Sequence, residues 1–331
     1  MVKSALKKLL LASGVLRLGG KLAGGGVAIL MYHSVREDPS VDCDVLGGII
    51  HSAPVFRGQM ELIARHFKPV SLDDVLDYLR GGKELGTPSV AVTFDDGYAD
   101  NYLVAKPILD QLGIPAIFYV AVDSIESQTL PWPGQLRHAF LTGRAASWTA
   151  ADGNVWRLDG RAERLRAFEA ASARCAKLCG KAQKTFLDRT REDLRAEPVA
   201  LKERPMMTWD EVRSLVRGEH LVGSHTMTHP NMAQLSETEA RAEFSESKER
   251  LSQQLGKPVV HFSYPCPALQ PHWADRTVDL SRQLGYETGV TTDGGVVRKG
   301  DNSLRLHRIR PTRTVQGIHW NLEYTFMGGI A

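Results

Sequence analysis

Continuous apolar runs alternate along the chain with segments whose apolar residues recur at helical spacing. A short apolar run bounded by turn residues predicts a buried strand, and an apolar residue every three or four positions predicts an amphipathic helix. On this pattern, strands are predicted at residues 27–33, 88–94, 114–122, 220–225, 259–265 and 286–292. Helices are predicted at residues 56–67, 71–82, 101–113, 208–218, 236–256 and 276–285. This alternation predicts a parallel α/β architecture, either a barrel or an open sheet.

Capping residues support two of these helices. Ser71 suits the N-cap of the helix at 71–82, and Gly81 suits its end. Ser236 and Glu239 have the spacing of a capping box, and Gly256 ends the helix that they begin.

Two parts of the chain depart from the alternation. Residues 132–160 indicate irregular or hairpin structure and residues 161–196 one or two charged helices, so we interpret about 122–205 as an insertion in a domain at 27–331. Residues 1–26 contain five basic residues and no acidic one, and their longest apolar stretch is too short for the roughly 20 residues that span a bilayer. We interpret this segment as a basic amphipathic helix that lies either on the domain or on an anionic membrane surface.

Composition narrows the class of protein only slightly. With 43% hydrophobic and 24% charged residues, the 331-residue chain has the make-up of a soluble globular protein. A net charge of +3 is too small to indicate a nucleic-acid partner. Four cysteines in a chain of this length form no disulfide framework, and we interpret Cys175 and Cys179 as small buried apolar residues. A reducing compartment is therefore expected. The sequence of residues 1–26 gives no clear export signal, so the location is expected to be the cytoplasm, either free or at the inner membrane surface.

Polar residues follow four of the predicted strands. They are His33, the pair Asp95 and Asp96, the pair His225 and His229, and the loop after Tyr264 and Pro265. In parallel α/β folds, ligands bind at the carboxyl ends of the strands, so these residues are expected to meet.

The histidine pair and the aspartate pair together indicate a metal site. His225 and His229 are four apart, so on a helical turn they face the same way, and with Asp96 they offer two imidazoles and one carboxylate to a catalytic ion. Asp95 would stay free to take a proton from a water that the ion activates. The alternatives are a solvated Asp-Asp-Gly turn, two histidines on a solvated face, or a non-haem iron site.

Three motifs resemble those of the polysaccharide deacetylase family, the NodB-homology carbohydrate esterases. They are TFDDGY at 93–98, SHTMTH at 224–229 and FSYPCP at 262–267, and the resemblance extends over about 27–312 through LMYHSV and LRLHRIRP. It implies a distorted (β/α) barrel and a hydrolase that removes N-acetyl or O-acetyl groups from an acetylated glycan. The glycan stays open between a chitooligosaccharide, a peptidoglycan and an exopolysaccharide intermediate.

The resemblance also assigns roles by position. It implies that Asp95 is the catalytic base and that Asp96, His225 and His229 bind a divalent ion, with zinc expected first and cobalt, nickel or iron as alternatives. The backbone amide of Cys266, which follows Tyr264 and Pro265, takes the place that stabilises the oxyanion.

The chain also departs from the family pattern. Ser263 stands near the place of an arginine that orients the base, so Arg308 or Arg310 is expected to supply that charge, and Arg308 is grouped with the substrate-binding residues. Pro267 replaces the glycine usual there, and no Asp-Trp motif is present. His307 directly follows Leu306, where the family places the leucine two residues before its general acid, so His33 and His307 compete for that role. These departures keep two alternatives open, a carbohydrate-binding protein without turnover and a two-histidine, one-carboxylate iron enzyme.

Overall fold

The structure is a computed structural model. It describes residues 7, 10–11, 13–22, 26–40, 46–85, 88–201 and 204–329.

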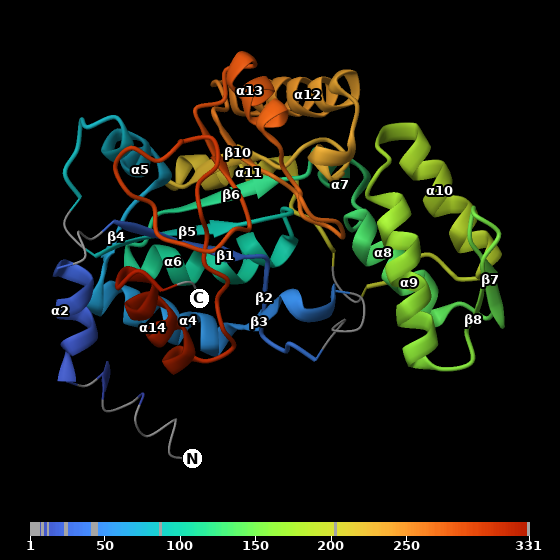
Figure 1. Ribbon diagram of the computed structural model, residues 1–331, viewed down its shortest axis with the longest axis horizontal. Helices are drawn as coiled ribbons and strands as arrows, with labels where there is room; N and C mark the ends of the chain where they lie inside the picture. The colour runs from blue at the N-terminus through green and yellow to red at the C-terminus, as the bar shows by residue number, and fades with distance from the viewer. Residues whose placement is uncertain are drawn as a thin grey trace.

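A parallel sheet forms the centre of the molecule, in the order β1-β5-β6-β9-β10-β11, with β4 also paired to β5 (Figure 1). The strands are β1 (Val27–Tyr32), β4 (Lys68–Pro69), β5 (Ser89–Phe94), β6 (Ala116–Val120), β9 (Leu221–Ser224), β10 (His261–Ser263) and β11 (Thr288–Val290). Apart from the short β4, each was predicted from an apolar run, and every pair in the sheet is parallel.

A segment near the C-terminus joins the two edges of this sheet. Leu306 bonds to β11, donating to Gly289 O at 2.7 Å and accepting from Thr291 N at 2.9 Å. Three residues later, Ile309 bonds to β1, donating to Ile29 O at 2.7 Å and accepting from Met31 N at 3.1 Å. The sheet therefore curls into the distorted barrel that was expected, with 306–309 completing the wall.

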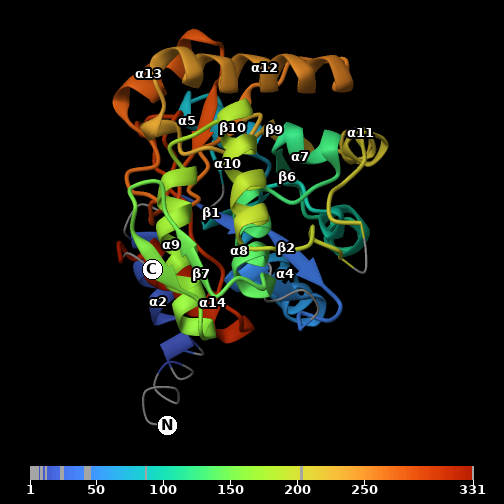
Figure 2. The same cartoon turned by 90° about the vertical axis from the view of Figure 1, so that its right-hand side faces the viewer.

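Helices surround the curled sheet, with α12 and α13 on one side and α4 and α14 on the opposite side in both views (Figures 1 and 2). They are α4 (Ala53–His66), α5 (Leu72–Leu79), α6 (Lys106–Leu112), α11 (Trp209–Arg217), α12 (Glu237–Leu255), α13 (Asp275–Gln283) and α14 (Val315–Phe326). Ser71 caps α5 as predicted and forms a capping box with Asp74, which was not predicted. The predicted capping box of Ser236 and Glu239 forms, and Gly256 ends α12 in the left-handed conformation. The helix α14 was not predicted.

The side chains of β5 alternate between two hydrophobic cores, one on each face of the sheet. Val90, Val92 and Phe94 pack into the larger core beneath the helices, whereas Ala91 packs into a second core on the other side of the sheet. Because side chains alternate along a strand, Thr93 and then Asp95 fall on the same side as Ala91. The strand thus directs Asp95 to the inner side of the curled sheet.

The stretch between β6 and β9 forms a lobe beside the barrel (Figure 1). After α7 (Val122–Ser127) it contains α8 (Trp132–Thr142), the hairpin β7 (Ser147–Thr149) and β8 (Val155–Arg157), and the helices α9 (Arg161–Cys175) and α10 (Gly180–Asp193). The lobe has a core of its own that includes Phe140, Trp148 and Cys175. The hairpin and the two charged helices agree with expectation, but α8 falls where irregular or hairpin structure was predicted. Its Pro133 lies in the first helical turn, which tolerates proline.

The described part of the N-terminal segment is a helix packed on the domain. Helix α2 (Val15–Leu22) packs against α14, and the rest of the expected amphipathic segment falls mainly on residues 1–6, 8–9, 12 and 23–25, outside the described residues. None of the described helices is long and apolar enough to cross a membrane.

Candidate active site

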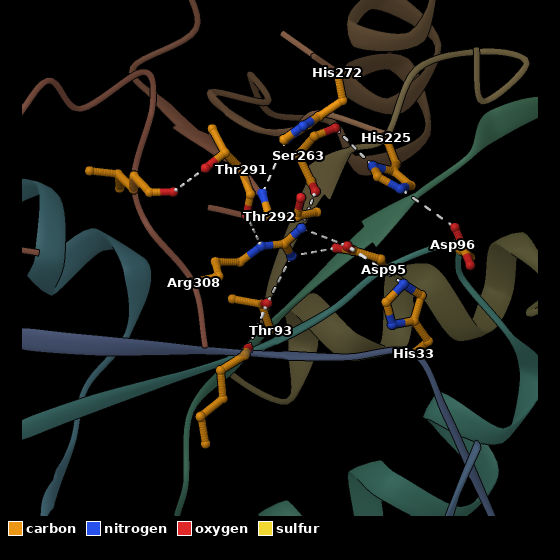
Figure 3. A network of polar contacts seen from close by, with 12 residues as sticks. His33, Thr93, Asp95, Asp96, His225, Ser263, His272, Thr291, Thr292 and Arg308 are labelled. Carbon is orange, nitrogen blue, oxygen red and sulfur yellow. Dashed lines mark hydrogen bonds and ion pairs between the residues drawn. The ribbon is translucent and has the colours of Figure 1, made fainter. Parts of the chain in front are cut away.

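Asp95 follows β5 directly and is held by Arg308 (Figure 3). The guanidinium Nη1 and Nη2 donate to Asp95 Oδ1 and Oδ2, each at 2.8 Å. The remaining N–H groups of Arg308 donate to Thr93 Oγ1 at 3.2 Å, Ser263 Oγ at 3.2 Å and Thr291 O at 2.7 Å. All five N–H groups of the arginine therefore have protein acceptors, and its planar fork fixes the carboxylate plane.

This arrangement settles which arginine accompanies Asp95. Arg308 is buried and contacts the aspartate, whereas Arg310 is exposed and lines the cleft. The grouping of Arg308 with substrate-binding residues is corrected, because its donors are all used inside the protein. Ser263, which stands where the family arginine was expected, accepts one of those bonds.

The charge of this arginine decides the protonation of Asp95. Burial acts to raise the pKa of Asp95, but Arg308, His225 and His33 together hold that pKa below its usual value. A buried carboxylate beside a guanidinium is ionised at neutral pH and can accept a proton.

Asp96, His225 and His229 converge beside this pair. Asp96 Oδ1 lies 3.5 Å from His225 Nε2 and 3.2 Å from His229 Nε2, and one ligand atom from each residue lies within 4.8 Å of the others. Atoms bound tetrahedrally at about 2.0–2.1 Å from one zinc ion lie about 3.3 Å apart. Asp96 Oδ1 is buried without a well-aligned hydrogen bond among the described residues, as expected for an atom that binds an ion. The three residues therefore fit a divalent metal.

The histidine ligands are oriented by backbone contacts rather than by a helix. Residues 225–229 form a loop in which Thr226 (φ 68°) and His229 (φ 58°) are left-handed, so the helical turn expected for His225 and His229 is absent. The two rings nevertheless meet, with centroids 4.9 Å apart. The backbone carbonyl of Ser263 lies 2.8 Å from His225 Nδ1, which places the proton on that nitrogen and leaves Nε2 to bind a metal.

Two residues that the sequence reading missed hold this loop. The buried carboxylate of Glu243, on α12, accepts from the N–H groups of Met227 and Thr228 at 2.8 and 2.9 Å. Trp132, at the start of α8, donates its indole N–H to His229 O at 2.8 Å. Neither a glutamate inside a helix nor a tryptophan beside prolines carries a sequence signal for such a role.

The two histidines predicted as general acid lie in different places. His33 follows β1, and its Nε2 lies 4.0 Å from Asp95 Oδ2. Burial lowers the pKa of His33, although Asp96 and Asp95 act to raise it. His307 instead lies against Gly295 and does not line the cleft that contains His33, Asp95 and Asp96. The structure therefore does not bring His307 to the site.

The loop after β10 leaves one backbone donor in the expected place. The N–H of Tyr264 donates to Val290 O at 3.0 Å, and Pro265 has no N–H, so the next donor along the chain is the amide of Cys266. Tyr264 and Cys266 both line the cleft, but the Tyr264 hydroxyl points to Ser281, 3.3 Å away.

The cleft around these groups has a volume of about 400 Å³. Besides the predicted residues, it is lined by His51 on the short strand β3 (Ile50–Ser52), by Arg137 and Phe168 from the lobe, and by Arg310, which the sequence suggested only as a partner of Asp95. The lobe therefore forms one wall of the cleft.

Comparisons with known proteins agree with this geometry. The family model described as polysaccharide deacetylase matches residues 82–289, more than half of the chain. A Bacillus subtilis (strain 168) protein, YxkH, provisionally named a polysaccharide deacetylase, is 19% identical over 290 residues, which are 87% of this chain and 72% of that protein.

Two solved structures share the fold at low sequence identity. Deacetylase PplD of Streptococcus pyogenes, in complex with acetate, has a TM-score of 0.60 and 20% identity, with 91% of this chain and 98% of that chain covered. IcaB from Ammonifex degensii has a TM-score of 0.57 and 19% identity, with 90% of this chain and 97% of that chain covered.

Proposed function

The chain belongs to the polysaccharide deacetylase family, and from this premise we propose that it is a divalent-metal-dependent hydrolase that removes N-acetyl groups from an acetylated glycan. The observation that carries the proposal is the ionised Asp95, locked by Arg308 beside the Asp96, His225 and His229 cluster. Asp95 is a carboxylate that is not among the three candidate metal ligands but lies beside them, so it can take a proton from a metal-bound water. This favours hydrolysis over the iron-enzyme alternative.

In the proposed reaction, water adds to the acetamide carbonyl carbon and the C–N bond breaks, giving acetate and a free amine. Asp96, His225 and His229 would hold the ion, which would polarise the carbonyl and make the water more acidic. Asp95 takes the proton from the water, and Arg308 keeps that carboxylate ionised and oriented beforehand.

Two further groups complete the proposed mechanism. The Cys266 N–H is proposed to donate to the oxygen that becomes negative as water adds. His33, 4.0 Å from Asp95, is proposed to give a proton to the leaving amine. His307 is not carried into the mechanism, because it lies outside the cleft.

The test is acetate release from N-acetylated oligosaccharides, beginning with chitooligosaccharides, by protein stripped of metal and reloaded with Zn²⁺ or Co²⁺. Asp95→Asn keeps the shape of the side chain and should abolish release, and His33→Gln should lower kcat. His307→Gln is the matched control and should retain activity. Full activity of Asp95→Asn would refute the assignment of the base.

The same experiment separates the carbohydrate-binding alternative. A metal-loaded protein that binds oligosaccharide without releasing acetate from any substrate would favour binding over catalysis. The position of Asp95 supports turnover, because an ionised carboxylate beside the set of metal ligands can take a proton from a water bound there.

A further inference from the structure

Helices α2 and α14 carry a concentration of exposed apolar side chains. Among the described residues, six large apolar side chains are exposed, and four of them lie here: Val15 (57%), Leu18 (60%), Tyr324 (43%) and Met327 (43%). Scattered single apolar residues are normal on a protein surface, but a cluster indicates an interaction site.

Close packing of the two helices makes these side chains one surface. Leu16 of α2 is buried, so this side of the helix faces the protein. The two glycines of α2 allow the helices to approach closely: a Cβ on Gly19 would lie 3.3 Å from the Met327 side chain, and a Cβ on Gly20 would lie 3.0 Å from Phe326 Cβ. Both views show the two helices side by side, on the side of the sheet opposite α12 and α13 (Figures 1 and 2).

Aromatic and basic groups extend this surface. The ring of Trp320 stacks with that of Tyr324, with centroids 6.3 Å apart, and Lys7 Nζ lies 4.6 Å from the Trp320 ring centroid. We call Lys7, Val15, Leu18, Trp320, Tyr324 and Met327 the α2–α14 face.

The sequence of the N-terminal segment carries charge of one sign. Residues 1–26 contain Lys3, Lys7, Lys8, Arg17 and Lys21 and no acidic residue. The sequence of α14 contains one carboxylate, Glu323, which is buried and lies 3.6 Å from His319 Nε2. No exposed acidic side chain of either helix therefore offsets the basic residues.

We propose that the α2–α14 face docks the protein on the surface of an anionic phospholipid bilayer. Tryptophan and tyrosine prefer the interface between lipid and water, where an apolar helix face can enter the acyl boundary while lysines contact the headgroups. A second copy of the chain fits less well, because a symmetric dimer would bring the basic segments of both copies together.

The test is co-sedimentation of the full chain with phosphatidylcholine vesicles with and without phosphatidylglycerol. Binding should require phosphatidylglycerol and should weaken as salt screens the lysines, a measurement that needs no variant. Leu18→Glu should weaken binding at least about tenfold, since one apolar side chain is withheld from the lipid and a negative charge is added. Lys7→Glu should weaken binding by about fivefold or more.

Val155→Glu is the matched control, because Val155 is a 65% exposed apolar residue on the hairpin of the lobe. It should bind as the wild type does. The proposal is overturned if the wild type binds neither kind of vesicle, if it binds neutral vesicles equally well, or if it forms a dimer that Leu18→Glu dissociates. The result does not depend on acetate release, so this proposal and the proposed activity can fail separately.

Discussion

At the scale of single residues, the site depends on a buried pair whose members need each other. Arg308 has no N–H left for a substrate, and Asp95 has both carboxylate oxygens bound to the guanidinium. Removing one partner of a buried pair leaves an uncompensated charge, which costs much more than the pair contributes as a whole. Arg308 is therefore a positioning residue for Asp95.

We expect Arg308→Gln to lower the free energy of unfolding by about 3–5 kcal/mol, because the Asp95 charge stays buried without its partner. Activity should fall by about 10²–10⁴-fold, the usual contribution of a positioned general base. Urea unfolding and acetate release measure the two effects. Arg310→Gln, at an exposed arginine two residues further on, is the control for charge and should leave stability unchanged. An equal loss of unfolding free energy in Arg308→Gln and Arg310→Gln would contradict the role given to Arg308.

A second carboxyl makes stability depend on pH. Burial raises the pKa of Asp100 to about 6, against the opposing effects of Ser34, the Val35 N–H and Arg36. Because the folded carboxyl holds its proton more tightly than the unfolded one, its contribution to stability is full below about pH 4 and is lost as the pH rises through about 6.

Asp100→Asn removes this titration. The unfolding free energy of the wild type relative to Asp100→Asn should fall as the pH rises from about 4 to about 6, by up to about 3 kcal/mol. Denaturant unfolding of both proteins at a series of pH values measures the difference. A difference that is constant across this range would show that Asp100 does not titrate as stated.

At the scale of elements, the lobe and the barrel meet at the loop that carries the histidine ligands. The loop adopts left-handed φ values at Thr226 and His229, which cost free energy in residues other than glycine. Glu243 of the barrel accepts from the N–H groups of Met227 and Thr228, and Trp132 of the lobe donates to the carbonyl of His229 next to them. The lobe thus forms a wall of the cleft and also fixes the position of His229.

Trp132→Phe should therefore weaken metal binding, by about 10- to 100-fold, the range typical of groups that orient a metal ligand. The change keeps an aromatic ring but removes the donor to His229 O. Titration with Zn²⁺ against a competing chelator measures the affinity without reference to activity. Trp148→Phe changes a buried tryptophan in the core of the same lobe and should leave the affinity unaltered. If both variants bind zinc as the wild type does, the lobe does not position His229.

The sequence predicted the strands and the residues at their ends because both depend on local pattern. An apolar run identifies a buried strand, and a parallel sheet brings strand ends together, so Asp95, Asp96, His225 and His229 could be grouped before the fold was known. The choice between Arg308 and Arg310 could not be made, because it depends on how the 306–309 segment bonds to both edges of the sheet, 213 residues from Asp95. Trp132 and Glu243 were missed for the same reason: their contacts join separate elements.

At the scale of the whole molecule, the proposed metal site connects distant parts of the barrel. Asp96 follows β5, whereas His225 and His229 follow β9, and β6 lies between these strands in the sheet. Burial acts to raise the pKa of Asp96, but hydrogen bonds and charge from His225 and His229 lower that pKa well below its usual value. The Asp96 carboxylate is therefore ionised and available to a cation. An ion bound to all three would link both strand ends in the folded state alone.

Metal binding should therefore stabilise the whole fold. A free ion concentration of about 100 times Kd should add about 2.7 kcal/mol to the free energy of unfolding, seen as a rise in Tm over chelator-treated protein. His229→Ala should remove this rise because it deletes a ligand, whereas His307→Ala should retain it because His307 lies outside the cleft. Scanning calorimetry with and without Zn²⁺ measures both variants against the wild type. A rise that persists in His229→Ala would place the stabilising ion elsewhere in the molecule.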